Sequence, residues 1–342
     1  MNYRPLGRTG LKVSELCLGT MTFGSNFFNI AQVGQEEATR MVGRALEAGV
    51  NFFDTADMYS YGEAEEILGK ALHSLGVDRD AVVIATKVRS PMSSAAMDGS
   101  GDPNNVGLSR KHIMAAVEAS LRRLGTDHID LYQVHGWDRL APMEETLRAL
   151  DDLVRQGKVH YLGCSNWTAR HLAKALAWSD ARGRERFVSL QAYYSLAGRD
   201  LEHELLPLAA EEGLGVLPWS PLSGGFLGGR IRRDQKLPGD TRRAGFDFPP
   251  VDRERGFDAI DALAAVADEL ETTIPQVALA WLLTRPAVSA VIIGAKRMEQ
   301  LDDNLGAARL ELTPDQIARL AATTQPPSLY PAWMVERQNL GR

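Results

Sequence analysis

The sequence predicts an α/β fold, and within that class a (β/α)8 barrel, also called a TIM barrel. Short apolar runs alternate with amphipathic stretches along nearly all of the 342 residues, and eight such strand–helix units are the number that a barrel requires. The competing α/β fold, a doubly wound sheet, needs G-x-G-x-x-G directly after its first strand, and that spacing does not occur. The glycine-rich run GGFLGG at 224–229 comes late with a different spacing, which is typical of a loop. We therefore expect the barrel.

The elements of this barrel follow from the pattern in chain order. The opening segment YRPLGRTGLKVSEL predicts a small N-terminal β-hairpin that turns at residues 8–10. Apolar runs then predict eight strands, at 16–19, 51–54, 82–87, 129–135, 159–165, 188–192, 215–219 and 290–293. Between them, apolar residues at helical spacing predict helices that include 35–48, 63–75, 109–124, 142–156 and 168–182. No linker or shift in composition divides the chain, so we expect a single domain over residues 1–342.

Two long polar stretches interrupt the alternation. Residues 90–107 are small and polar, and residues 220–256 combine glycines with many charges and with Pro238, Pro249 and Pro250. Loops of this length in a compact domain are commonly lids, binding loops or disordered insertions. Each follows a predicted strand, so both are expected on the C-terminal face of the barrel, where the active sites of such barrels lie.

Composition and charge narrow the classes of partner. The net charge of −6 and the isoelectric point of about 5.7 argue against binding to nucleic acid or to an anionic membrane. The two cysteines, Cys17 and Cys164, are too few for a disulfide framework and lack metal-ligand spacing. The N-terminus has no apolar signal core, and no apolar run approaches the length of a membrane span. We therefore expect a cytoplasmic protein with no nucleic-acid partner, no membrane partner and no metal site.

Four polar side chains stand at or just beyond the ends of three neighbouring strands. Asp54 ends the second predicted strand and Tyr59 follows it by five residues, while Lys87 and His135 end the third and fourth strands. Taken singly, each has a common structural explanation as a cap, a packed ring or a solvated strand end. In a barrel, however, strand ends converge on one face, so we expect these four groups to meet there.

Together the four groups would make a proton donor. A free tyrosine titrates near ~10, and a neighbouring ammonium group could lower that pKa by roughly 1–3 units. The Asp54 carboxylate would keep Lys87 charged, and His135 would donate a hydrogen bond to a substrate oxygen as negative charge develops on it. The set suits the protonation of a carbonyl oxygen, and it contains no metal-ligand cluster, nucleophile elbow or phosphate-transfer loop.

Several segments, taken in order, resemble the aldo-keto reductase superfamily over nearly the whole chain. They run from LGRTGLKVSELCLGTMTFG, through FFDTADMYSYGEAEEILG, ATK, DLYQVHGWD, YLGCSNW, LQAYYSL and WSPLSGG, to GAKRMEQLDDNL. The resemblance is strongest to the bacterial-type branches and to the potassium-channel β-subunits. It implies that Asp54, Tyr59, Lys87 and His135 form the catalytic tetrad, with Tyr59 as the general acid. In channel β-subunits the histidine position is commonly replaced, so His135 favours an active enzyme.

The resemblance also implies that NADP(H) lies across the C-terminal mouth of the barrel. Ser165, Asn166 and Gln191 would bind the nicotinamide carboxamide, and Trp219 would stack on the ring. The expected contacts with the remainder of the cofactor are Thr20, Met21, Ser220, Pro221, Leu222, Arg230, Arg242, Gly294, Ala295, Lys296, Arg297, Gln300, Asp303 and Asn304. Lys296 and Arg297 would meet an adenosine 2′-phosphate. Asp303 stands where many relatives carry glutamate, which puts the adenine contact in doubt.

The expected activity is NADPH-dependent reduction of aldehydes or ketones to alcohols, and two rival functions stay open. One is a lyase that uses Lys87 as a Schiff-base nucleophile, which requires a neutral lysine. The other is a redox-sensing subunit that binds nicotinamide and turns over slowly. Relatives occur as monomers and as larger assemblies, so a homo-oligomer also stays open. The expected substrate is a small carbonyl compound, and four residues could either line its pocket or pack beneath loops: Phe28, Met58, Trp137 and Trp167.

Overall fold

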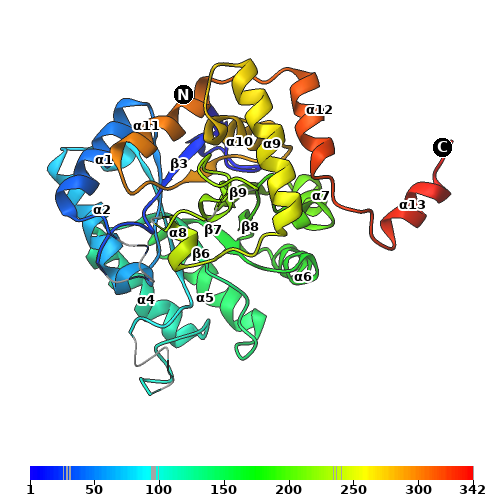
Figure 1. Cartoon of the computed structure of the whole chain (residues 1–342). Helices are drawn as coiled ribbons and strands as arrows, with labels where there is room; N and C mark the ends of the chain where they lie inside the picture. Colours follow the sequence, from blue (N-terminus) through cyan, green and yellow to red (C-terminus); the bar gives the residue numbers. More distant parts are fainter. Residues whose placement is uncertain are drawn as a thin grey trace.

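A computed structural model of the chain contains the predicted barrel. It describes residues 1–25, 27, 30, 32–93, 98, 100–233, 235, 237–239 and 241–341. The eight barrel strands run parallel in the order β10-β3-β4-β5-β6-β7-β8-β9. Figure 1 shows the strands at the centre of the molecule with helices around them. Their bounds are β3 Leu16–Gly19, β4 Phe52–Asp54, β5 Val83–Val88, β6 Ile129–Val134, β7 Val159–Ser165, β8 Phe187–Tyr193, β9 Gly215–Trp219 and β10 Val291–Ile293. The prediction of a (β/α)8 barrel is confirmed, with each strand within two residues of its expected bounds.

Backbone hydrogen bonds bring the two outermost strands of this order together. The N–H of Val216 in β9 donates to Ala287 O at 2.7 Å, and the N–H of Ser289 donates back to Val216 O at 3.0 Å. Residues 287–289 lead directly into β10, which pairs with β3 on its other side. The sheet is therefore nearly closed, and the carboxyl ends of all eight strands surround one mouth.

The N-terminal hairpin covers the opposite end of the barrel. Strands β1 (Tyr3–Pro5) and β2 (Lys12–Ser14) pair antiparallel, as predicted, and Leu6 between them is fully buried among the side chains of the barrel interior. Gly7 is left-handed, with φ 55°, and a Cβ there would lie 2.6 Å from the backbone of Val188, Gly213 and Gly215. Only glycine fits such a close approach, so the hairpin can seat itself against the barrel end.

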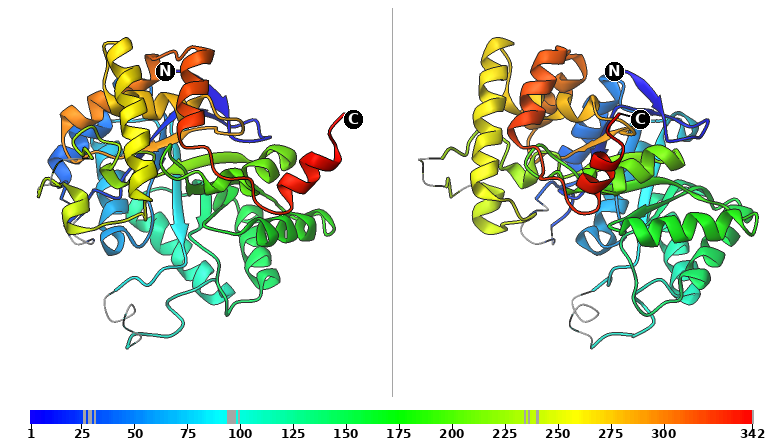
Figure 2. Two further views of the ribbon diagram at one scale, coloured as in Figure 1. Left: turned by 45° about the vertical axis from the view of Figure 1, so that its right-hand side comes forward. Right: turned by 90° about the vertical axis from the view of Figure 1, so that its right-hand side faces the viewer.

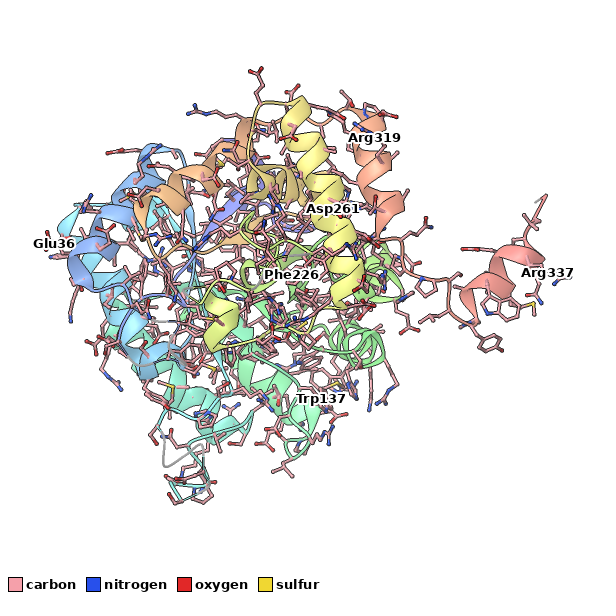
Figure 3. The ribbon with its side chains drawn as sticks, in the orientation of Figure 1. Glu36, Trp137, Phe226, Asp261, Arg319 and Arg337 are labelled. Carbon is pink, nitrogen blue, oxygen red and sulfur yellow. The ribbon has the colours of Figure 1, made fainter. Side chains whose placement is uncertain are left out.

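The helices surround the barrel with their charged faces outward. Their bounds are α1 Gln35–Glu47, α2 Glu63–Ser74, α4 Arg110–Leu124, α5 Met143–Arg155, α6 Ala169–Asp180, α7 Leu205–Glu212, α8 Arg242–Gly245, α9 Arg253–Glu269, α10 Ile274–Leu283, α11 Met298–Gly306, α12 Pro314–Thr323 and α13 Ala332–Gln338. Figure 3 labels three exposed charges, Glu36, Asp261 and Arg319, on the outer faces of α1, α9 and α12. The five helices predicted from periodicity are all present, and Ser109 and Thr168 cap two of them with their side chains.

Two segments stand apart from the barrel. Figure 2 shows the described residues 100–108, which precede α4, projecting from the body, and helix α13 lies away from the other helices. No helix in the described part of the chain is long and apolar enough to cross a membrane.

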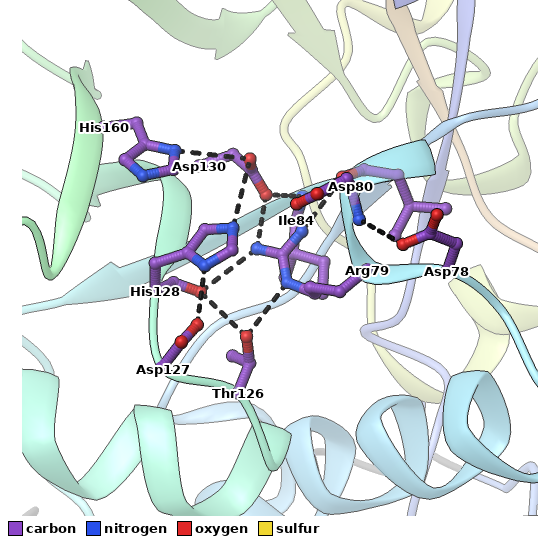
Figure 4. Close-up of polar contacts among 10 residues, drawn as sticks. Asp78, Arg79, Asp80, Ile84, Thr126, Asp127, His128, Asp130 and His160 are labelled. Carbon is purple, nitrogen blue, oxygen red and sulfur yellow. Dashed lines mark hydrogen bonds and ion pairs between the residues drawn. The ribbon is translucent and has the colours of Figure 1, made fainter.

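A polar network joins strands β5, β6 and β7 near their amino ends, on the face opposite the mouth (Figure 4). Arg79 donates to Asp130 Oδ2 at 2.6 Å and to Val82 O at 3.0 Å, and the Ile84 N–H donates to the same carboxylate oxygen at 2.9 Å. The rings of His128 and His160 stack at 4.5 Å. These two histidines and Asp130 have ligand atoms within 4.8 Å of one another, a grouping that the sequence spacing did not indicate. Because Arg79 and Ile84 engage Asp130, the network ties the starts of adjacent strands together.

Candidate active site

A buried ion pair lies at the base of the barrel mouth. Lys87 in β5 donates from Nζ to Asp54 Oδ1 at 2.5 Å and to Thr55 O at 2.8 Å, with side chains 0% and 3% exposed for Lys87 and Asp54. The second carboxylate oxygen accepts from Gln191 Nε2 at 2.8 Å and from Gln133 Nε2 at 3.1 Å. Both oxygens of Asp54 thus have hydrogen-bond partners, as a buried polar group requires.

The surroundings of Lys87 keep its ammonium group charged. Burial by itself would lower the pKa of Lys87, but the Asp54 carboxylate and the Tyr59 phenol together raise it above its usual value. The expectation that Asp54 opposes loss of the lysine proton is therefore confirmed. A charged amine is not a nucleophile, so this environment counts against a Schiff base at Lys87.

Tyr59 lies above this pair at the start of a short 3₁₀ turn, η1 (Tyr59–Gly62). The next two residues, Ser60 and Tyr61, have left-handed φ values of 48° and 52°, which turn the chain sharply after Tyr59. The Lys87 Nζ lies 5.1 Å from the centre of the Tyr59 ring. The Lys87 charge lowers the pKa of Tyr59, as expected. Burial raises this pKa more than Lys87 lowers it, so the pKa of Tyr59 lies above its usual value in this structure.

His135 completes the group from the next strand end. It follows β6 directly, and its ring meets the Tyr59 ring edge-on with centroids 5.8 Å apart. Burial and the nearby charges of Lys87 and Arg89 lower the pKa of His135 well below its usual value, so the imidazole is neutral. Its Nδ1 is buried without a hydrogen-bond partner in the described part of the structure. A neutral imidazole here can give or accept one hydrogen bond at a substrate oxygen.

Four more predicted residues stand beside these four, at or near the ends of β7, β8 and β9. Asn166 follows the buried Ser165 with a left-handed φ of 56°, and its Oδ1 accepts from Trp219 Nε1 at 3.1 Å. The Trp219 ring stacks on Phe248, with centroids 5.8 Å apart and planes inclined by 11°. Gln191 turns its amide toward Asp54, whereas Ser165 and Asn166 face each other. The strand ends therefore gather all eight side chains at one mouth.

Comparison with known proteins agrees with this geometry. A profile of the Aldo/keto reductase family matches residues 15–325. The chain belongs to the aldo/keto reductase family. "Uncharacterized oxidoreductase YrpG" of Bacillus subtilis (strain 168) is 41% identical over 91% of this chain and 92% of its own length. "Versiconal hemiacetal acetate reductase" of Aspergillus parasiticus is 36% identical over 97% and 99%. "Probable voltage-gated potassium channel subunit beta" of Oryza sativa subsp. japonica is 36% identical over 95% and 97%.

Membership of the aldo/keto reductase family supports an oxidoreductase that acts on carbonyl groups, and family members generally use nicotinamide cofactors. The surroundings of Arg242 indicate whether this chain can accommodate the phosphates of such a dinucleotide. Its Nε is buried without a hydrogen-bond partner in the described structure, and burial together with the charge of Arg243 lowers its pKa to about 10. An anion would relieve that cost. Arg242 is also within electrostatic range of both Tyr59 and Lys296.

The loops after β9 and β10 hold further residues expected at the cofactor. Ser220 has φ 52° and its Oγ accepts from the Gly224 N–H at 2.8 Å, which closes a tight turn through Pro221 and Leu222. Lys296 and Arg297 begin the segment that enters α11, with Arg297 exposed at the N-terminal end of the helix. Arg230 is also exposed.

Several other residues expected at the cofactor form hydrogen bonds within the protein or lie buried. Asp303 accepts from Thr273 Oγ1 and Gln276 Nε2, both at 2.8 Å, and so joins α11 to α10. Backbone atoms of the segment 294–296 are held by three side chains, since Asn304 Nδ2 donates to Gly294 O, Thr22 Oγ1 donates to Ala295 O and Gln300 Oε1 accepts from the Lys296 N–H. Thr20 Oγ1 is buried without a partner in the described structure, and Met21 packs partly buried beside it.

Two contributors to the site are not among the residues expected from the sequence, and one expected pocket residue lies outside the described structure. Gln133 was not singled out, although a glutamine inside the apolar strand YQVH was an available signal. Phe248 gave no signal, because its place against Trp219 depends on how the 220–256 loop folds back. Among the four candidate pocket residues, Phe28 lies outside the described residues. Met58 and Trp137 are partly buried, and Trp167 is buried against Trp137 and Phe187.

Proposed function

We propose that this protein is an NADPH-dependent reductase that converts aldehydes or ketones to alcohols. The observation that carries the proposal is the buried Lys87–Asp54 pair beneath Tyr59, with a neutral His135 at its side. The bound cofactor supplies a hydride, two electrons and one proton nucleus, to the carbonyl carbon. Tyr59 gives its phenolic proton to the carbonyl oxygen and regains one from solvent. Overall, one carbonyl compound, one NADPH and one proton yield one alcohol and one NADP⁺.

Each residue of the site has a defined task in this proposal. Lys87 stabilises the phenolate that Tyr59 becomes, because its positive charge acts on that oxygen. Asp54 holds Lys87 charged and in place. His135 binds the carbonyl oxygen and orients the substrate. Ser165, Asn166 and Gln191 bind the carboxamide, and Trp219 covers the nicotinamide ring. Of these, Gln191 must turn its amide away from Asp54, whose Oδ2 keeps the hydrogen bond from Gln133.

The preference for NADPH over NADH rests on Lys296 and Arg297. Both stand at the start of α11, where cations and backbone N–H groups meet a 2′-phosphate favourably. A hydrogen bond between charged groups contributes about 1.5–3 kcal/mol, so one such contact supports at least a tenfold preference. We also propose a cytoplasmic location, which suits the two buried free thiols, Cys17 and Cys164.

A panel of aldehydes, sugars and cyclic ketones, assayed with NADPH and with NADH, tests the proposal. We expect turnover with at least one carbonyl class and a lower Kd for NADPH. Lys296→Ala/Arg297→Ala should weaken NADPH binding while leaving NADH binding nearly unchanged. The matched control, Arg40→Ala/Lys70→Ala, removes the same charges from exposed positions on α1 and α2. Equal affinity of the unmodified protein for both cofactors would refute the NADPH preference.

Two rival functions predict different results. Some relatives are named as probable voltage-gated potassium channel subunits beta, which keeps a slow redox-sensing role as the second candidate. Single-turnover oxidation of bound NADPH by a carbonyl compound, followed by rapid multiple turnover, would separate the enzyme from such a sensor. A lyase that uses Lys87 would instead be trapped covalently by borohydride with substrate present, and the charged state of Lys87 predicts no trapping.

A further inference from the structure

A cavity of about 880 Å³ opens beside His135 at the mouth of the barrel. It lies over the loops that follow β5, β6 and β7. One of its lining residues, Trp137, is labelled in Figure 3. Among the described residues, its lining contains three arginines and no aspartate or glutamate. The lining residues that matter most are Arg89, His135, Trp137, Arg139, Arg170 and His171. The cavity is therefore positively charged next to the predicted reaction centre.

Arg89 is the arginine built most firmly into this cavity. It follows β5 directly with φ 146°, a backbone conformation that is costly for a residue with a side chain. Its Nε donates to Trp137 O at 3.1 Å, and its stem passes over Gly136, where an added Cβ would lie 3.5 Å from the Arg89 Cδ. The charge of Arg89 helps to lower the pKa of His135. Arg89 is thus held in a fixed place within electrostatic range of His135.

Nothing in the described lining neutralises these charges. Asp138 lies within electrostatic range of Arg89, but its carboxylate accepts the N–H groups of Leu108 and Leu140 and forms no ion pair with Arg89. Arg170 contacts His171 Nε2 at 2.8 Å. Burial and the charges of Arg170 and Lys174 lower the pKa of His171, so this histidine does not add a permanent charge.

The cavity also has a flat aromatic wall. The rings of Trp137 and His171 stack with centroids 3.8 Å apart and planes inclined by 2°. Trp137 also meets Trp167 edge-on at 4.9 Å, which fixes the orientation of the wall. A planar organic group can pack against such a surface while a charged end reaches the arginines.

The phosphates of the cofactor have other partners in the proposed function. These partners are Arg242, Lys296 and Arg297, on the loops after β9 and β10. In the strand order, β9 and β10 are the two outermost strands, whereas the cavity lies over the loops after β5, β6 and β7 in the middle. The arginines after β5, β6 and β7 are therefore left for the substrate. Resting on the proposed carbonyl reduction, we propose that the substrate carries an anionic group, carboxylate or phosphate, that binds in this cavity with Arg89 as its anchor.

Matched aldehydes test this proposal. 4-Carboxybenzaldehyde carries a charge, whereas methyl 4-formylbenzoate has a similar shape without one. The ester group withdraws more electron density than the carboxylate, so intrinsic reactivity favours the ester and cannot by itself produce a preference for the acid. Glyceraldehyde 3-phosphate and glyceraldehyde form the phosphate arm. We expect kcat/KM for an anionic member to exceed that of its neutral partner by at least about tenfold at low salt, and the ratio to fall as ionic strength rises.

Arg89→Met keeps an unbranched stem over Gly136 and removes the charge. We expect it to lower the acid-to-ester ratio by about tenfold or more, whereas Arg148→Met, at an exposed position on α5, should leave the ratio unchanged. A wild-type ratio near one in both arms would overturn the proposal. So would a ratio that persists in Arg89→Met, because the anchor would then lie elsewhere.

Equilibrium binding separates this inference from the proposed function. Titration with 4-(hydroxymethyl)benzoate, followed by tryptophan fluorescence, measures anion binding without turnover. If no carbonyl compound is reduced but this acid binds in an Arg89-dependent way, carbonyl reduction fails and the anion site stands. If carbonyl compounds are reduced and neither binding nor turnover depends on charge, the anion site fails and carbonyl reduction stands.

Discussion

Replacing Tyr59 with phenylalanine removes the proposed proton donor while leaving most of its surroundings in place. The ring would keep its edge contacts with Phe27 at 5.4 Å and with His135 at 5.8 Å. Lys87 would keep its bonds to Asp54 Oδ1 and Thr55 O. The substitution therefore deletes one hydroxyl group from a folded site, so it isolates the chemistry from the packing.

The expected loss in rate is much larger than the expected loss in stability. A positioned general acid contributes about 10²–10⁴-fold, which corresponds to about 2.7–5.4 kcal/mol of transition-state stabilisation. The Tyr59 hydroxyl has at most an interaction with the nearby Lys87 ammonium group to lose, and a hydrogen bond of that kind contributes about 0.5–1.5 kcal/mol to folding. We therefore expect kcat for Tyr59→Phe to fall at least a hundredfold while the melting temperature changes by only a few degrees.

The assay is steady-state carbonyl reduction, combined with a direct measurement of NADPH binding. Tyr132→Phe is the matched control, because it also removes a buried phenolic hydroxyl from the barrel, and that hydroxyl has no partner in the described structure. We expect the control to retain kcat. The pH profile adds a second signature. Because burial holds the pKa of Tyr59 above its usual value near 10, reduction should stay nearly constant through neutral pH and decline only above about pH 10.

Two results would contradict this role for Tyr59. One is a Tyr59→Phe variant that retains more than about a tenth of the wild-type kcat. Such a loss, of less than about tenfold, is smaller than the loss expected when a general acid is removed. The other is an equal loss in Tyr132→Phe, which would point to disturbed packing. In the first case His135 becomes the proton donor to test next.

Three further predictions concern the same face of the barrel. Lys87→Met leaves the Asp54 carboxylate buried without its cation, and we expect the free energy of unfolding in urea to fall by about 3–5 kcal/mol. Adding Asp54→Asn should restore most of this free energy. If the double variant is no more stable than Lys87→Met, the unpaired buried charge is not the cause. Asp57 is buried with both carboxylate oxygens unpartnered in the described structure, and burial raises its pKa well above the usual value, so stability is lost as pH rises from about 4 toward that raised pKa. Asp57→Asn should therefore melt higher than wild type at pH 7 and show little of that gain at pH 4, whereas equal melting temperatures across this range would contradict the assignment. Trypsin cleavage between Arg230 and Arg243 should slow when NADP⁺ binds, and cutting that is unaffected by NADP⁺ would mark the loop as a passive insertion.

The alternation of strands and helices could be predicted because it depends on neighbours in the chain. Apolar residues at spacing 2 or 3.6 bury one face of an element wherever that element packs, so the pattern survives without knowledge of its partners. The same holds for the helix caps at Ser109 and Thr168, which bond to backbone N–H groups three residues on. The convergence of Asp54, Lys87 and His135 followed from the barrel itself, since parallel strands end on one face.

The tertiary structure decided the contacts between residues far apart in the chain and how deeply these residues are buried. The Gln191 amide reaches Asp54 across 137 residues of sequence, and Gln133 reaches it across 79. The direction of the Tyr59 pKa depends on a balance between desolvation and the Lys87 charge, and only the depth of burial decides that balance. The positive cavity at Arg89 arises where three separate loops meet. The sequence determined by itself which residues stand at the ends of the strands, because local periodicity places them there. Their hydration, their partners and their charges depend on packing over the whole barrel, which no local pattern encodes.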